Sequence, residues 1–294
     1  RTDFGKLLTS QTSPTITRRA TRSGLPILSD YFQETWRFRT FAWHWSLADV
    51  KAKNFETFLG RLWHIINPLL FGLIYFIFVG IVSGRGLDSI SLLAAIVGNL
   101  YAWLYFSSIV TSSIAAVQSG AGGVSGQSGI PKIVAPIASL LTATNLFLRS
   151  LIAYMIMHLI AQRGVHIEML LAPVVMILIG MLGFGSALIL ATLNVYLRDV
   201  SRLIPHILRL VMYLSPVIWE YTRVLGDGSL NFLARLNPFF SGITAWTISL
   251  GGTLDPDGPK IFEQIGVFSI WAVVIFCAGI LIFISKEDEF AIRN

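Results

Sequence analysis

The stretch IGVFSIWAVVIFCAGILIFI, Ile265–Ile284, decides the fold class of this chain. It contains no charged side chain and hardly any polar one. An α-helix rises about 1.5 Å per residue, so about twenty apolar residues are needed to cross the roughly 30 Å hydrocarbon core of a bilayer. The stretch therefore predicts a membrane-spanning helix.

The composition of the whole chain agrees with a membrane location. Of its 294 residues, 54% are hydrophobic and 13% are charged, about half the charge of a soluble domain, and the mean hydropathy is +0.69. Five further apolar stretches predict spans at Ile65–Val82, Ile90–Val117, Leu140–Ala161, Met169–Leu193 and Ile204–Trp219. We therefore expect an all-α polytopic membrane protein with six transmembrane helices.

One apolar segment before the last span is too broken to cross the membrane. FLARLNPFFSGITAWTISLGG, residues 232–252, is interrupted by Pro238 and by several glycines. Interrupted backbone at membrane depth has to be covered by protein or line a cavity. The segment predicts re-entrant short helices, or short helices that lie on the surface.

The distribution of positive charge predicts the orientation. With both termini cytoplasmic, sixteen Lys and Arg residues lie on the inner side and five on the outer side. This bias is typical of proteins of the plasma (inner) membrane. The net charge of +6 is then topological, and we expect no nucleic acid partner.

The chain before the first span divides into two parts. Residues 1–28 are polar and predict a flexible cytoplasmic arm, and residues 29–64 predict an amphipathic helix, with Ser29-Asp30 as its N-cap, that leads into the permease domain of residues 65–294. One face of that helix carries Phe32, Trp36, Trp43, Leu47 and Val50. Tryptophans on such a face favour a helix lying in the membrane interface, although the same face could pack on a soluble partner.

The glycine-rich stretch GAGGVSGQSGIPK, Gly120–Lys132, joins the second and third predicted spans. A phosphate-binding loop needs the order G-x-x-x-x-G-K-[ST], whereas Lys132 follows a proline. The apolar residues after it predict a short helix across the cytoplasmic membrane surface. The single cysteine and the five histidines show no metal-ligand spacing, so we expect no metal site.

Four stretches, in this order, resemble the ABC-2-type permeases that export polysaccharides such as O-antigen, teichoic acid and galactan. They are FLGRLWHIINPLL (Phe58–Leu70), GIPKIVAPIASLL (Gly129–Leu141), LNVYLRDVSRLIPHILRLVMYLSPVIW (Leu193–Trp219) and ARLNPFFSGITAW (Ala234–Trp246). Ala135 stands where the family more usually has an aromatic residue. Within the family, the basic arm is most similar to that of actinobacterial galactan exporters.

The resemblance implies a homodimeric permease without its own catalysis or cofactor, docked on two separate ATPase subunits that bind ATP and Mg²⁺. Together they would move a polyprenyl-linked glycan outward. By this analogy Lys132, Ile133 and Val134 are the segment that couples the ATPase to the spans, although an ordinary connector is the alternative. Arg198 and Asp199 predict a turn with an ion pair or helix cap, or else a further ATPase contact.

Aromatic residues near the middle of the second span suggest a conduit for a glycan. Tyr and Trp combine an apolar face with a polar group, and an interfacial belt would place them at the span ends instead. Tight helix packing is the alternative. The candidate channel residues are Tyr75, Asn99, Tyr101, Trp103, Tyr105, Phe106, Ser108 and Tyr213.

Three basic residues are candidates for the phosphate of a lipid carrier. Arg149 lies within the third predicted span, where a charge is costly unless it has a partner, or it extends toward the inner surface. Arg61 and His64 precede the first span and could equally mark the membrane interface. Two alternative functions stay open: export of drugs or lipids by a member of the same superfamily, and sugar transfer by a membrane glycosyltransferase.

Overall fold

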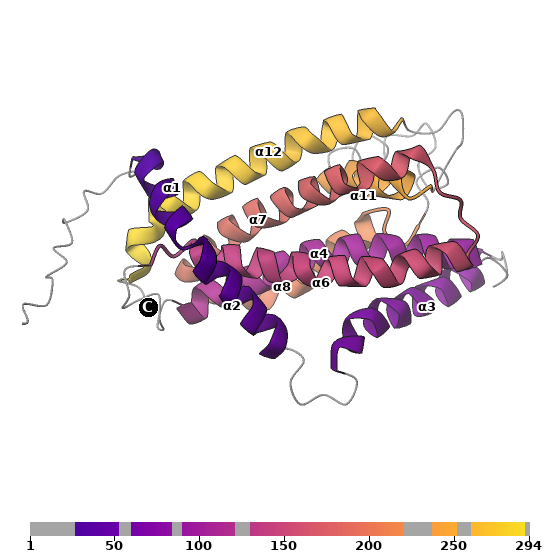
Figure 1. Ribbon diagram of the computed structural model, residues 1–294, viewed down its shortest axis with the longest axis horizontal. Coiled ribbons are helices and arrows are strands. Elements are labelled where there is room, and N and C mark those ends of the chain that lie inside the picture. The colour runs from indigo at the N-terminus through magenta and orange to yellow at the C-terminus, as the bar shows by residue number, and fades with distance from the viewer. Residues whose placement is uncertain are drawn as a thin grey trace, which may run out of the picture.

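The computed structural model describes residues 27–52, 60–83, 90–120, 130–219, 237–251 and 260–291. All regular structure in these ranges is helical (Figure 1). The α-helices are α1 (Leu28–Arg37), α2 (Arg39–Ala52), α3 (Trp63–Ser83), α4 (Ile90–Gly120), α6 (Val134–Ile160), α7 (Ala172–Tyr196), α8 (Val200–Leu214), α11 (Pro238–Ser249) and α12 (Ile261–Lys286). The 3₁₀-helices are η1 (Gly60–Leu62), η2 (Ile167–Leu171) and η3 (Glu287–Ala291).

Four long helices form the body of the molecule. α7 packs extensively on α12 and on α4, and α4 packs on α6, so these helices run side by side along the long axis (Figure 1). The stretches Ile90–Ser119, Val134–Ile160, Ile167–Tyr196 and Ile261–Phe290 are each long and apolar enough to cross a membrane. The predicted all-α, multi-pass membrane fold is confirmed at this level.

α7 and α12 approach closely because two glycines face each other. A Cβ atom added to Gly279 would lie 2.3 Å from the carbonyl oxygen of Gly185, and one added to Gly185 would lie 2.5 Å from the carbonyl oxygen of Ile275. Small residues let membrane helices pack backbone to backbone, where van der Waals contact replaces the hydrophobic effect as the driving force.

The first and fifth predicted spans differ from the other four. α3 contains a shorter apolar stretch, Ile65–Phe78. α8 has 15 residues, which is about 23 Å of helix. It ends at Leu214 because Ser215 adopts an extended ψ of 152°, the conformation that a following proline favours. Six spans therefore stay a prediction.

The described part of the broken segment before the last span, residues 237–251, contains the buried helix α11, and residues 232–236 and 252 lie outside the described residues. Asn237 caps it by accepting a hydrogen bond from the amide of Phe239 at 3.0 Å, and Pro238 occupies the first turn, where a missing N–H is tolerated. α11 packs on α12, α4 and α7. The surface-lying alternative is wrong for this helix, because most of its residues, including Phe240 and Trp246, are buried.

The N-terminal amphipathic helix is divided in two, which corrects the prediction of one continuous helix. α1 begins at Leu28, and within the described residues neither Ser29 nor Asp30 caps it. The break at Phe38 turns α2 so that Ala42 packs on Val134 and Ala138 of α6. Of the predicted apolar face, Val50 is buried, whereas Phe32, Trp36 and Trp43 are exposed. The arm lies outside the described residues, apart from residues 27 and 28.

The stretch after Lys132 is not a separate surface helix. α6 begins at Val134 and runs without interruption to Ile160, six residues earlier than the predicted third span. Pro136 lies in its first turn, where backbone N–H groups have no partner within the helix, so the proline does not break it. Residues 121–129 of the glycine-rich stretch lie outside the described residues.

Candidate functional site

A hydrogen-bonded cluster joins three distant parts of the chain at the end of the bundle where α1 and the C-terminal end of α12 lie (Figure 1). The carboxylate of Glu287 in η3 accepts hydrogen bonds from the backbone amide of Lys132 and from the hydroxyl of Tyr31. The ammonium of Lys132 donates to the backbone oxygen of Glu287 at 3.0 Å and lies 5.4 Å from the ring centroid of Phe290. We call Tyr31, Lys132 and Glu287 the clasp.

The clasp is half-buried, and this burial affects the pKa of its tyrosine, Tyr31. Burial, and then the negative charge of Glu287, raise the pKa of the Tyr31 hydroxyl well above its usual value. The hydroxyl therefore stays protonated and donates a hydrogen bond to the carboxylate of Glu287. Beside the clasp, Tyr196 donates to Glu289 at 2.5 Å, and Lys286 donates to the same carboxylate at 2.8 Å. Together these contacts tie α1, the residues just before α6, α7 and η3 to one another.

The predicted coupling residues lie at this clasp. Lys132 is half-buried, whereas Ile133 and Val134 are only 3% and 1% exposed. Val134 packs beneath α2, and Ile133 belongs to the main core. The side chains of Ile133 and Val134 therefore face the interior of this chain, and of the three only Lys132 keeps a half-exposed surface.

The predicted turn at Arg198 and Asp199 lies between α7 and α8, with both side chains exposed. In this described part of the chain, Asp199 occupies the N-cap position of α8 without a side-chain hydrogen bond. Asn194, near the end of α7, takes that role, because its Oδ1 accepts a hydrogen bond from the amide of Ser201 at 2.9 Å. The predicted cap by Asp199 is therefore replaced by a cap from Asn194.

Ser215-Pro216 and Asn237-Pro238, from the last two of the four family-like stretches, meet in the structure. Asn237 donates from Nδ2 to the hydroxyl of Ser215 at 3.0 Å. Asn99 of α4 donates to the carbonyl of Pro216 at 3.4 Å and accepts from Thr247 of α11 at 2.8 Å. This junction fixes the end of α8 against α4 and α11, so the predicted channel residue Asn99 acts here as a structural link.

Most of the predicted channel aromatics pack between helices, as the alternative interpretation expects. Tyr101, Trp103, Tyr105 and Phe106 are each at most 5% exposed. Tyr105 stacks on Phe147 with ring centroids 4.7 Å apart and pairs with the hydroxyl of Thr144 at 3.0 Å. Further ring contacts join Tyr101 to Tyr154, and both Trp103 and Phe106 to Phe239. Ser108 is half-buried.

The two other predicted channel residues form a pair at the surface. The hydroxyls of Tyr75 in α3 and Tyr213 in α8 lie 3.1 Å apart, and their rings meet edge to face with centroids 6.2 Å apart. Tyr213 is 45% exposed. Unlike the α4 aromatics, this pair presents aromatic surface and hydroxyl groups to the outside of the chain.

The basic candidates are distributed differently. Arg149 is exposed and lies near the middle of α6, with the exposed apolar residues Leu148 and Ile152 close to it in the sequence. Because α6 begins earlier than predicted, Arg149 is about 22 Å along the axis from the helix start. The side chains of Arg61 and His64 lie outside the described residues.

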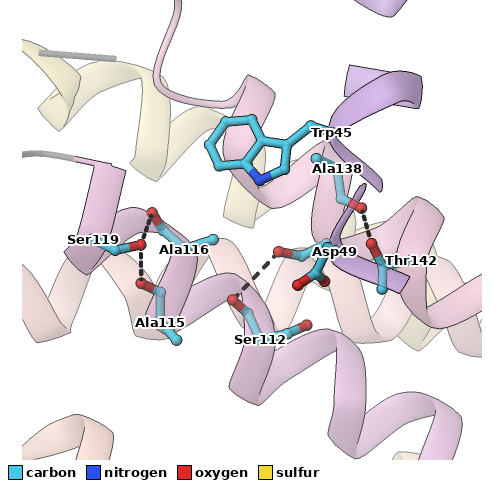
Figure 2. Close-up of a pocket in the computed structure, with 9 residues that line it drawn as sticks. Trp45, Asp49, Ser112, Ala115, Ala116, Ser119, Ala138 and Thr142 are labelled. Carbon is cyan, nitrogen blue, oxygen red and sulfur yellow. Dashed lines mark hydrogen bonds between the residues drawn. The ribbon is translucent and has the colours of Figure 1, made fainter. Parts of the chain in front are cut away.

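A cavity of about 380 Å³ opens between α2, α4 and α6 (Figure 2). It is lined by Trp45, Asp49, Ser112, Ala115, Ala116, Ser119, Ala138, Ser139 and Thr142. None of these residues was predicted to belong to a site, although Trp45 and Asp49 are spaced i and i+4 and so share a helix face. Within the described residues, no group of three or more His, Cys, Asp or Glu side chains is arranged to hold a metal ion.

The fold thus defines a multi-pass helical membrane protein. The chain is similar to the O-antigen export system permease protein RfbA of Klebsiella pneumoniae, at 23% identity over 245 residues, 83% of this chain and 90% of the relative. A second protein of that name from the same species is 24% identical over 247 residues, and the Myxococcus xanthus protein of that name is 24% identical over 245 residues. No protein-family model matches the chain.

Proposed function

We propose that this chain is the membrane-spanning permease subunit of an ABC transporter that exports a cell-envelope polysaccharide. The observation that carries the proposal is similarity to O-antigen export permeases over 83% of the chain and about 90% of each relative. Similarity over this length covers most of the chain rather than one short shared segment. The apolar helical bundle and its four candidate spans support the same function.

The energy for export comes, in this proposal, from separate ATPase subunits that bind ATP and Mg²⁺. The sequence contains no phosphate-binding loop of the G-x-x-x-x-G-K-[ST] type. The clasp supports a way to transmit force, because it fastens the start of α6 to α1 and η3. Since Ile133 and Val134 are buried, a push at Lys132 moves α6 as a rigid rod rather than through direct contact with those two residues.

We propose further how the permease assembles and which substrate it carries. The permease acts as a homodimer in the plasma membrane with both termini cytoplasmic, and its substrate is a polyprenyl-linked glycan, for which we favour galactan. Tyr75 and Tyr213 suit contact with the glycan because their rings and hydroxyls form an exposed pair. Arg149, exposed within α6, suits contact with a carrier phosphate at a subunit interface.

Depletion of the chain in its native host tests the proposal. Surface polysaccharide should disappear, and its lipid-linked form should accumulate inside the cell with sugar polymerisation unchanged. Galactose as the main sugar of the retained polymer would support the galactan assignment. A tagged chain should co-purify with an ATPase subunit. Normal surface polysaccharide, or sugar transfer by the purified chain alone, would contradict the proposal and favour a drug or lipid exporter or a glycosyltransferase.

A further inference from the structure

We propose that the cavity between α2, α4 and α6 is a binding site for a neutral sugar ring. The choice of a carbohydrate rests on the proposed function, whereas the site itself is defined by its lining. α4 contributes Ser112, Ala115, Ala116 and Ser119, spaced i, i+3, i+4 and i+7 along one helix face. Trp45 and Asp49 of α2 lie across the cavity from this face (Figure 2).

Polar oxygen atoms at the cavity act as hydrogen-bond acceptors toward a ligand. Ser119 donates its proton to the carbonyl of Ala115 at 2.9 Å, Thr142 to that of Ala138 at 3.0 Å, and Ser139 to that of Ser112 at 3.3 Å. A hydroxyl has one proton and two lone pairs, so the oxygen of the exposed Ser119 can still accept, whereas Ser139 and Thr142 are 7% and 1% exposed and mainly form the wall of the cavity. The carboxylate of Asp49 adds further acceptor oxygens. Such a lining suits a ligand rich in donors, which a sugar ring is.

The charge of the lining disfavours a phosphate. None of the nine described lining residues is Lys or Arg, and the one ionisable side chain among them is Asp49. Phosphate groups are bound by Arg, Lys and backbone N–H groups. The cavity therefore suits a sugar of the glycan rather than the pyrophosphate of its lipid carrier.

Trp45 provides the stacking surface that a sugar ring uses. Its ring packs edge to face on Phe41, with centroids 5.6 Å apart, which holds the indole in place. An indole offers both an apolar face and an N–H donor. The cavity volume of about 380 Å³ falls within the roughly 300–1,000 Å³ of small-molecule sites.

The position of the cavity gives the sugar site a role. The cavity lies near the C-terminal end of α4 and the N-terminal end of α6, close to the clasp. In the predicted orientation this end faces the cytoplasm. A sugar bound between α2, α4 and α6 would hold the glycan beside the helix that the ATPase is proposed to move.

Saturation-transfer NMR on the full chain in lipid nanodiscs tests the site. The probes are methyl β-galactoside and methyl β-glucoside, with inorganic pyrophosphate and choline as the competing ligand classes. Magnetisation should pass to at least one of the two sugars. Trp45→Ala should lower the affinity for that sugar about tenfold, which is the upper range for one aromatic contact. Trp45→Phe should lower the affinity less. Trp43→Ala is the matched control, because Trp43 lies on the same helix, is 47% exposed and does not line the cavity.

A second variant keeps the test decisive if Trp45→Ala does not fold. Ala116→Leu fills the cavity from a half-exposed position on α4 and should abolish sugar binding while the protein stays folded. In cells it should lower surface polysaccharide at an unchanged membrane level. The proposal is overturned if neither sugar binds, if all variants bind equally, or if pyrophosphate or choline binds in preference. Since sugar binding is measured without export, failure of the sugar site can be told apart from failure of the proposed function.

Discussion

Glu287 accepts a hydrogen bond from the backbone amide of Lys132, although the two residues are 155 positions apart in the sequence. The contact joins the end of α12 to the start of α6, and Tyr31 adds α1 to the same carboxylate. A partly buried carboxylate with these donors is costly to remove, because the donors lose their acceptor without regaining water. The clasp therefore fixes the geometry of the proposed coupling segment.

Replacement of Glu287 tests this fastening. Glu287→Ala should lower stability by about 1–3 kcal/mol, because it leaves the amide of Lys132 and the hydroxyl of Tyr31 without their acceptor. Glu287→Gln keeps a carbonyl acceptor and should cost less. The thermal midpoint of the detergent-purified protein measures the effect. Glu263→Ala is the control, since Glu263 is an exposed carboxylate at the opposite end of α12; equal midpoints for the two Ala variants would contradict the clasp.

Tyr31 predicts a specific dependence of stability on alkaline pH. Its pKa is raised in the folded chain by burial and by Glu287, so folding favours the protonated hydroxyl. The corresponding stability is fully present below the pKa of an unfolded tyrosine, about 10, and is lost as pH rises above that value. The wild-type chain should therefore lose its stability advantage over Tyr31→Phe progressively as pH rises above about 10. Parallel denaturation curves across this range would show that Tyr31 does not donate to Glu287.

Two glycines of α12 predict opposite effects of the same substitution. Gly279→Ala places a methyl group 2.3 Å from the carbonyl oxygen of Gly185, so α7 and α12 must move apart, and we expect a loss of about 2 kcal/mol or more. Gly266→Ala meets no atom within 4 Å and should stabilise the helix by up to about 1 kcal/mol. Thermal midpoints of the two variants check this, and a drop of similar size in both would contradict the close packing.

The long spans were predictable from the sequence because their signal is local. An uninterrupted apolar run has to be long enough to cross the bilayer, and α4, α6, α7 and α12 satisfy this in their own residues. The break at Phe38 follows no proline or glycine, and we have no sequence signal for it. The early start of α6 was not predicted, because the apolar residues after Lys132 were expected to form a separate short helix, whereas Pro136 lies in the first turn of α6 and does not break it.

The candidate site was less predictable because it depends on tertiary contacts. Lys132 was identified through its segment, but its partner Glu287 was not. The acidic run Glu287-Asp288-Glu289 directly after an apolar span was an available signal, since it opposes the positive charge expected on the inner side. Mid-span aromatics such as Tyr105 carry no charge and suit a channel or a helix contact equally, and only their burial separates these roles.

The two groups of tyrosines predict different outcomes on mutation. Tyr105 is 5% exposed and stacks on Phe147, so Tyr105→Ala should cost about 3–5 kcal/mol, as for buried aromatics in general, and reduce the amount of folded protein. Tyr105→Phe removes only the hydroxyl contact with Thr144 and should cost about 1 kcal/mol. Tyr213 is 45% exposed, so Tyr213→Ala should change stability by no more than about 1 kcal/mol.

Export then separates packing from glycan contact. If Tyr213 faces the polysaccharide, Tyr213→Ala should lower surface polysaccharide while membrane level and ATPase-subunit binding stay unchanged. Tyr213→Phe keeps the ring but loses the hydroxyl near Tyr75, and should give an intermediate export level. Tyr105→Ala should lower export only in proportion to the folded protein that remains. If export by Tyr105→Ala falls further than its amount of folded protein, the α4 aromatics have a channel role after all. If export by Tyr213→Ala is normal, the pair of Tyr75 and Tyr213 has no such role.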